Sequence, residues 1–109
     1  MCGIAGFCQW NQDFTYEKER WTGVLIQMRE SLAHRGADQT GEYLRKNAGL
    51  SHTRLSIRDL EGGAQPMVRR DEEREYAIVY NGEVYNTEQL IPELKRRGYR
   101  FETNSDTEV

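Results

Sequence analysis

The sequence begins Met1-Cys2-Gly3-Ile4-Ala5-Gly6, and this start limits the possible folds more than any other stretch. When Met1 is removed, Cys2 becomes the N-terminal residue and carries both a thiol and a free α-amine. The reference pKa values of these groups are roughly 8.5 and 7.7–8.0. Such an amine can accept the proton of a side-chain nucleophile directly or through a water. Gly3 and Gly6 leave room beside the thiol for a substrate or a second backbone. The alternative interpretation is a buried N-terminal strand that contains a small apolar cysteine.

Composition excludes several classes of partner. The chain has 109 residues, of which 37% are hydrophobic and 30% are charged, as in one small globular domain. Fifteen basic and eighteen acidic residues leave a net charge of -3, so we expect no binding to nucleic acid or to a membrane surface. No apolar run approaches the roughly 20 residues that span a bilayer, and we therefore expect a cytoplasmic protein. With two cysteines and two histidines and no Cys-x-x-Cys spacing, we expect no metal site.

The apolar pattern predicts a strand and then a helix within the first 36 residues. Residues 3–10 suit a buried strand. Cys2 and Cys8 are six residues apart along this extended segment, so a disulfide between them is geometrically unfavourable. Thr15 can cap the helix that follows, and Gly36 can end it. One apolar stripe runs along this helix and consists of Trp21, Val24, Leu25, Met28 and Leu32.

Hairpins are expected in the middle of the chain. Residues 42–45 and 49–55 predict two strands joined by Lys46-Asn47-Ala48. Residues 60–67 contain Gly62-Gly63 and a proline, which predicts a loop. Residues 76–80 predict a further strand, and we expect it to turn at Asn81-Gly82 and return at Val84-Tyr85.

The last third of the chain predicts a helix, a strand and the start of another helix. Residues 87–97 follow a helical pattern in which Pro92 marks either the start of the regular helix or a kink. Residues 99–103 predict a strand, and residues 105–108 match a helix capping box. The predicted class is α+β, with residues 1–109 forming part of one domain.

Polar groups of defined chemistry accompany these elements. The amide of Asn81 and the N–H of Gly82 can point at one oxygen, which is the arrangement of an oxyanion hole. A turn without function is the alternative. Arg54 and Asp106 supply the two charges that an amino-acid substrate requires. Each also has a structural interpretation, as a strand arginine whose stem covers apolar surface and as an acid at a helix N-terminus.

Six motifs occur in order along the chain, and together they resemble the glutaminase domain of asparagine synthetases, which are class II amidotransferases with an N-terminal nucleophile. The related phosphoribosyl and fructose-phosphate amidotransferases also begin with Cys-Gly-Ile, whereas the third, fourth and fifth motifs are more similar to the asparagine synthetase branch. The motifs are Met1 to Gly6, His34-Arg35-Gly36-Ala37-Asp38, Ser51-His52-Thr53-Arg54-Leu55-Ser56-Ile57, Ala64-Gln65-Pro66-Met67, Asn81-Gly82-Glu83-Val84-Tyr85-Asn86 and Ser105-Asp106-Thr107-Glu108-Val109.

The resemblance implies a fold and a set of residue roles. The fold is an αββα sandwich of two antiparallel sheets, of the Ntn-hydrolase type, and residues 1–109 would be its N-terminal portion. Cys2 would attack the side-chain amide of glutamine and release ammonia through a thioester, while Asn81 and Gly82 stabilise the oxyanion. The other implied residues bind the substrate: Arg54 its α-carboxylate, Asp106 and Glu83 its α-ammonium, and Leu55 and Ile57 the length of the pocket.

The resemblance also implies partners that lie outside the chain. In the family, ammonia passes to a C-terminal domain that activates aspartate with ATP and magnesium, and no cofactor is expected within residues 1–109. Two alternatives stay open: a non-catalytic interaction or regulatory module of the same fold, and the glutaminase part of a synthetase-like enzyme that makes a different amide. The chain departs from the family pattern at Ala37, Ser51 and Arg58, where proline, glycine and a smaller apolar residue are usual.

Two further expectations concern the chain as given. While Met1 is attached, the α-amine of Cys2 is part of a peptide bond and cannot accept the thiol proton, so this form is expected to be inactive. The domain of the family extends well beyond residue 109, so the sheets of a truncated chain would have open edges. Because open sheet edges invite pairing with other strands, we expect a homo-oligomer in which two chains cover each other's sheets.

Overall fold

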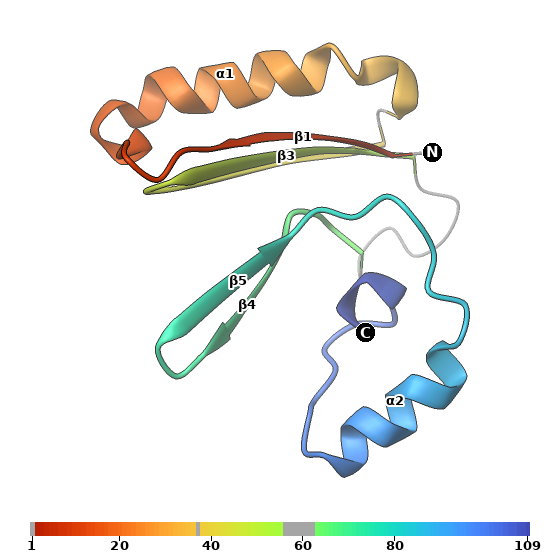
Figure 1. The fold of residues 1–109 in the computed structure, drawn as a ribbon. Coiled ribbons are helices and arrows are strands. Elements are labelled where there is room, and N and C mark those ends of the chain that lie inside the picture. Colours follow the sequence, from red (N-terminus) through yellow and green to blue (C-terminus); the bar gives the residue numbers. More distant parts are fainter. Residues whose placement is uncertain (1, 37, 56–62) are drawn as a thin grey trace.

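The computed structural model describes residues 2–36, 38–55 and 63–109, which form two antiparallel sheets and their helices (Figure 1). This arrangement confirms the expected α+β class. The strands are β1 (Gly3–Cys8), β2 (Gln39–Arg45), β3 (Ala48–Arg54), β4 (Met67–Asp71) and β5 (Arg74–Ile78). The α-helices are α1 (Lys18–Glu30) and α2 (Thr87–Arg96), and short 3-10 helices span Phe14–Glu17, Ala33–Arg35 and Asp106–Glu108.

The first sheet has the order β1-β3-β2, with the central strand β3 antiparallel to both neighbours. The expected β2–β3 hairpin is confirmed, and its turn consists of Lys46-Asn47, with Ala48 already in β3. Since side chains alternate along a strand, one face of the sheet packs on α1 and the other faces the rest of the chain (Figure 1).

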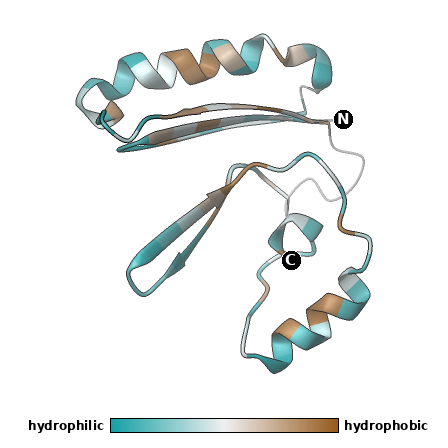
Figure 2. Ribbon diagram, viewed as in Figure 1, coloured by the Kyte–Doolittle hydropathy of each residue, from teal (hydrophilic) through white to brown (hydrophobic). Residues whose placement is uncertain are grey.

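The apolar core lies between α1 and the first sheet. Three aromatic rings from β1, the first 3-10 helix and α1 pack together, with ring centroids 4.6 to 5.5 Å apart: Phe7, Phe14 and Trp21. Leu25 is fully buried next to them. Figure 2 shows the corresponding apolar stretch in the middle of α1. The expected apolar stripe therefore provides the contact between this helix and the sheet.

The first helical region differs from the expected helix at both ends. Its cap is Asp13 rather than Thr15, since the Asp13 carboxylate accepts hydrogen bonds from both the backbone N–H and the hydroxyl of Thr15. The α-helix ends at Glu30, and a separate 3-10 turn leads to Gly36. The pattern did not separate the two because an apolar stripe can continue from an α-helix into a 3-10 turn.

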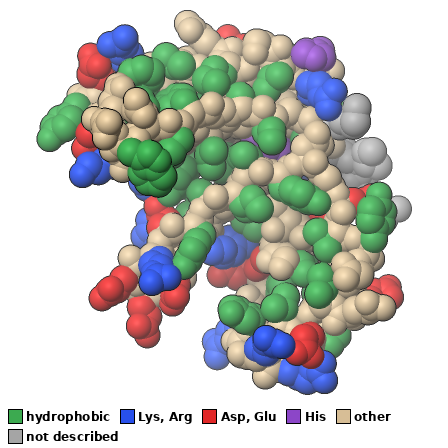
Figure 3. All heavy atoms as spheres, viewed as in Figure 1, with side chains coloured by type: hydrophobic (Ala, Val, Ile, Leu, Met, Phe, Trp, Pro, Cys, Tyr) green, Lys and Arg blue, Asp and Glu red, His purple; other side chains and the backbone are tan. Residues whose placement is uncertain are grey.

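The second sheet corrects the prediction of a hairpin at Asn81-Gly82. The strand expected at 76–80 is β5, but its partner is the preceding strand β4, to which it is joined by Glu72-Glu73. The stretch 79–83 after β5 contains no strand. Sequence reasoning missed β4 because Arg69 and Arg70 interrupt its apolar pattern, although charged residues are common in a strand with an open edge. Acidic side chains gather at the tip of this hairpin (Figure 3).

The C-terminal third also differs from the prediction. The helix α2 runs from Thr87 to Arg96 with Pro92 inside it, so the regular helix does not begin at the proline. The strand expected at 99–103 is absent, and this stretch has no regular structure. The backbone N–H groups of Glu102 and Thr103 instead donate to the carboxylate of Glu108. A side chain therefore provides the acceptors that a neighbouring strand would otherwise supply.

Glu75 on β5 joins the two sheets. Its carboxylate accepts hydrogen bonds from the Tyr43 hydroxyl at 2.6 Å and from Nε of Arg45 at 2.7 Å, both on β2. Nε of Arg70 on β4 donates to the same carboxylate at 2.8 Å. The hydrogen bonds from Arg45 and then Tyr43 lower the pKa of Glu75 from 4.5 to about 2. The ionised carboxylate is therefore the form that holds the sheets together.

We predict that Glu75→Gln weakens the protein only while the native carboxylate is ionised. The folded pKa of about 2 lies below the ordinary 4.5, so the contribution of Glu75 is complete above pH 4.5 and is lost as the pH falls through about 2. Urea unfolding of the wild type and the variant across this range should give a stability difference near neutral pH that shrinks on acidification. A difference that is the same at every pH would contradict the assigned ion pairs.

Candidate functional site

A pocket of about 710 Å³ lies between the end of the first sheet and the C-terminal half of the chain. Segments distant in sequence meet there: the start of β1, the end of β3, the stretch 80–85 and the stretch 105–107. Its lining combines apolar surface with charged and polar side chains, as is common in sites for small molecules. The lining residues are Cys2, Arg54, Leu55, Gly63, Gln65, Tyr80, Asn81, Gly82, Glu83, Tyr85, Ser105, Asp106 and Thr107.

The first wall of the pocket is formed by the ends of two paired strands. Gly3 pairs with Thr53, and continuing this register by one residue places Cys2 opposite Arg54. Both side chains consequently lie on the face of the sheet that is turned away from α1. The Cys2 thiol is free and half-buried. A thiol and a guanidinium thus share one end of the sheet.

Arg54 is held in place by its neighbours. Its Nη1 atom donates to Oε1 of Gln39 on β2 at 2.8 Å. Gly63 lies directly against the guanidinium, because a Cβ atom built at this position would be 2.6 Å from Nη2 of Arg54. Glycine at position 63 therefore leaves the space that the guanidinium occupies at the pocket wall.

The second wall is the stretch 80–85, which carries Asn81, Gly82 and Glu83. This stretch is held by side chains rather than by a sheet. Oε1 of Gln65 accepts a hydrogen bond from the Tyr80 backbone N–H at 2.6 Å. Oδ2 of Asp106 accepts one from the Val84 N–H at 2.8 Å.

The third wall is the C-terminal 3-10 turn that presents Asp106. Ser105 caps this turn, as expected, by accepting a hydrogen bond from the Thr107 N–H at 3.2 Å. The expected capping box is incomplete, because Glu108 does not bind back to the Ser105 N–H. The Ser105 N–H donates instead to the Thr103 hydroxyl. Asp106 consequently faces the pocket from the first residue of a capped turn.

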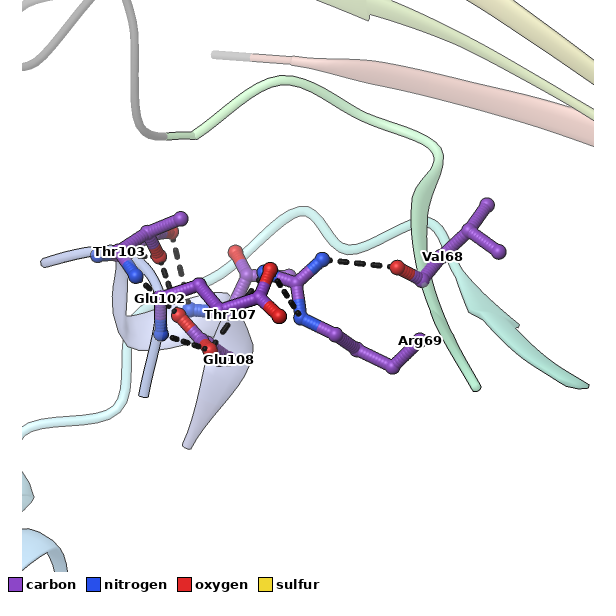
Figure 4. Close-up of polar contacts among 7 residues, drawn as sticks. Val68, Arg69, Glu102, Thr103, Thr107 and Glu108 are labelled. Atoms are coloured by element: carbon purple, nitrogen blue, oxygen red, sulfur yellow. Dashed lines mark hydrogen bonds and ion pairs between the residues drawn. The ribbon is translucent and has the colours of Figure 1, made fainter. Parts of the chain in front are cut away.

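Glu108 anchors that turn to the second sheet (Figure 4). Its carboxylate is 6% exposed, lies 3.5 Å from Nη2 of Arg69 on β4, and accepts the hydroxyl hydrogen bond of Thr103 at 2.5 Å. Burial alone would raise the pKa of Glu108, but the hydrogen bonds from Thr103 and Glu102 and the Arg69 charge lower it overall. The buried carboxylate is therefore kept in its ionised form.

His52 lies behind the pocket between the two layers. It is 1% exposed, and neither ring nitrogen makes a well-formed hydrogen bond with the described residues, although the Tyr80 backbone lies close enough to favour the protonated ring. Burial lowers the pKa of His52, the Tyr80 backbone opposes this shift, and the Arg54 charge adds to it. A neutral imidazole thus fills the space between the first sheet and the stretch that carries Asn81.

The structure brings most of the sequence-predicted site residues together. The pocket lining includes Cys2, Arg54, Leu55, Asn81, Gly82, Glu83 and Asp106, whereas Ile57 lies outside the described residues. Sequence reasoning missed Gln65 and Thr107 as pocket residues. Their signals were present, because both lie in the motifs 64–67 and 105–109, but no chemistry had been assigned to them.

No helix among residues 2–36, 38–55 and 63–109 is long and apolar enough to cross a membrane. In the same residues, no three His, Cys, Asp or Glu side chains are grouped closely enough to hold a metal ion.

The fold and the pocket define an α+β protein in which a cysteine near the N-terminus shares a cavity with an amide, a guanidinium and a carboxylate. This chain belongs to the glutamine amidotransferase domain family, whose family model matches residues 1–109. Membership implies the Ntn-type sandwich, with which the two antiparallel sheets agree.

Similar curated proteins are glutamine-hydrolyzing asparagine synthetases. Asparagine synthetase 3 of Bacillus subtilis (strain 168) is 40% identical over 109 residues, and asparagine synthetase B of Escherichia coli (strain K12) is 36% identical. Asparagine synthetase 1 of Arabidopsis thaliana is 34% identical. These alignments cover 100% of the chain but only 17% or 18% of each relative. The chain therefore spans about a sixth of the length of the curated relatives that it matches.

We predict that Glu108→Gln lowers the free energy of unfolding by about 1.5–3 kcal/mol, the range for hydrogen bonds to charged groups. Glu102→Gln is the matched control, because Glu102 also faces Arg69, at 3.6 Å, but its side chain is 71% exposed. Exposed ion pairs contribute at most about 1 kcal/mol. Urea unfolding of both variants checks this, and equal losses would show that the buried carboxylate does not anchor the turn.

Proposed function

We propose that this chain carries the glutamine-hydrolysing site of a glutamine-dependent asparagine synthetase, with Cys2 as its nucleophile. One observation carries the proposal: the pocket lining combines Cys2, Arg54, Asn81, Gly82 and Asp106, which arrive from four separate segments. A thiol, two oxyanion donors and two opposite charges are the set that hydrolysis of an amino-acid amide needs. Residues 1–109 are, on this proposal, the N-terminal portion of the amidotransferase domain.

The proposed reaction starts at the Cys2 sulfur. After Met1 is removed, the free α-amine accepts the thiol proton, and the sulfur attacks the side-chain carbonyl carbon of glutamine. The C–N bond breaks, the proton passes to the leaving nitrogen, and ammonia departs from the resulting glutamyl thioester. Water then attacks the thioester carbonyl, which releases glutamate and restores the thiol. The tetrahedral oxyanion of each step accepts hydrogen bonds from the Asn81 side chain and the Gly82 N–H.

The charges of the pocket suit the other end of the substrate. Arg54 binds the α-carboxylate, since a guanidinium offers two parallel donors to a carboxylate. Asp106 binds the α-ammonium together with Glu83. The oxygen Oδ2 of Asp106 already accepts the Val84 N–H, which orients the carboxylate before glutamine arrives. Leu55, which is 45% exposed, contacts the apolar middle of the substrate.

The ammonia product requires an acceptor outside residues 1–109. The names of the curated relatives describe glutamine-hydrolyzing asparagine synthetases of which this chain matches 17% or 18%. We therefore assign the acceptor chemistry, which consumes aspartate and ATP and requires magnesium, to a C-terminal synthetase domain of the whole protein, acting in the cytoplasm. An enzyme that makes a different amide would share the same glutamine site, and product analysis of the whole protein separates the two.

We predict that Cys2 is the only thiol needed for turnover. In the whole protein, Cys2→Ala should abolish glutamate release, whereas Cys8→Ala should retain most of it. Cys8 is exposed and lies at the far end of β1, away from the pocket lining. Full activity of the Cys2 variant would refute the mechanism. If the site is instead a non-catalytic module, the wild type itself should show no glutaminase activity.

We predict that the charged residues and the oxyanion donor affect different kinetic constants. Arg54→Ala and Asp106→Ala should chiefly raise KM for glutamine, by about 10-fold or more, because each removes a charge-assisted hydrogen bond of roughly 1.5–3 kcal/mol. Asn81→Ala should instead lower kcat by about 10²–10³-fold, as for other oxyanion-hole donors. Steady-state glutamate release measures both constants, and the same pattern in all three variants would argue against these roles.

A further inference from the structure

We propose that Gln65 is a positioning residue that sets the distance between the oxyanion donors at Asn81-Gly82 and the ammonium-binding carboxylate of Asp106. This inference rests on the proposed function of the pocket. Gln65 lines the pocket but takes no direct part in the proposed reaction.

Both ends of the Gln65 carboxamide are engaged. Oε1 accepts the Tyr80 N–H at 2.6 Å, and Nε2 donates to the Thr107 hydroxyl at 3.3 Å. Tyr80 immediately precedes Asn81, and Thr107 immediately follows Asp106. One side chain consequently bridges the second and third walls of the pocket. Only a carboxamide offers an acceptor and a donor on the same planar group at this length, since a carboxylate lacks the donor and an ammonium lacks the acceptor.

The backbone of Gln65 is itself seated on the first sheet. A Cβ atom at Gly41 on β2 would lie 2.3 Å from the Gln65 carbonyl oxygen and 3.0 Å from Cδ of Pro66. The missing side chain at position 41 thus allows the 65–66 backbone to rest against the strand. Gly41 pairs with His52 of β3, two residues from Arg54. Gln65 therefore connects the second and third walls of the pocket to the sheet that carries Cys2 and Arg54.

The bridge matters because neither wall is part of a sheet. The stretch 79–83 has no regular structure, and the C-terminal turn is a three-residue 3-10 helix. A backbone N–H without a partner loses its preferred orientation, and a displacement of about 1 Å at a reacting group can cost 10²-fold in rate. The Tyr80 bond consequently governs the oxyanion donors and hence kcat. The Thr107 bond governs Asp106 and hence KM for glutamine.

Three variants separate these two links in the whole protein. Gln65→Met removes both bonds at similar volume, and we expect kcat to fall about 10-fold and KM to rise about fivefold, the factor that one hydrogen bond of about 1 kcal/mol provides. Thr107→Val removes only the second bond, so KM should rise about fivefold with little loss of kcat. Thr107→Ser keeps the hydroxyl and should restore KM. Gln27→Met, at an exposed position of α1, is the matched control for the glutamine-to-methionine change.

Amide hydrogen exchange provides a readout that does not depend on turnover. By NMR, exchange of the Tyr80 amide should become at least several-fold faster in Gln65→Met and remain unchanged in Thr107→Val and Gln27→Met. Equal Tyr80 exchange in Gln65→Met and the wild type would overturn the inference, as would equal kinetic constants in those two proteins. A wild type that hydrolyses no glutamine would overturn the proposed function, while Tyr80 exchange would still decide whether Gln65 holds this wall.

Discussion

The antiparallel pairing of β1 with β3 is the constraint on which the rest of the pocket depends. The register that pairs Gly3 with Thr53 places Cys2 opposite Arg54, on the face turned away from α1. A slip by one residue would turn every side chain of β1 to the other face and point the thiol toward the helix. The aromatic cluster around Phe7 prevents that slip, because its ring must lie on the α1 side of the same strand.

The other walls of the pocket are irregular backbone, and polar side chains give them their shape. Gln65, Asp106 and Glu108 accept hydrogen bonds from backbone N–H groups at Tyr80, Val84, Glu102 and Thr103. These acceptors replace the ladder of a sheet, which is how a non-repetitive segment satisfies its backbone. Figure 4 shows one of them, where Glu108 meets Arg69 of β4. Asn81, Gly82 and Asp106 thus lie on segments fixed by side-chain hydrogen bonds. Cys2 and Arg54 lie at strand ends fixed by strand pairing.

Sequence reasoning succeeded where local pattern and tertiary contact agree. The apolar run of β1, the helical stripe around Leu25 and the turn at Lys46-Asn47 were all identified, and the structure contains each of them. It failed at Asn81-Gly82, whose dipeptide is a strong hairpin signal, because β5 finds a better partner upstream. Residues 67–71 were missed as a strand because Arg69 and Arg70 interrupt its apolar pattern. In the structure Arg70 forms an ion pair with Glu75 on the neighbouring strand β5, and Arg69 forms one with Glu108 in the C-terminal turn.

The sequence by itself determined the class of this protein and indicated the proposed chemistry. A cysteine behind the initiator methionine, an amide beside a glycine and six ordered motifs can all be recognised without coordinates, because they depend on residue type and order alone. Only the tertiary structure decided how Cys2, Arg54, Asn81 and Asp106 come to line one pocket, and that Gln65 and Glu108 hold its walls. The two hydrogen bonds of Gln65 join residues 15 and 42 positions apart. No local propensity encodes such hydrogen bonds or the strand register.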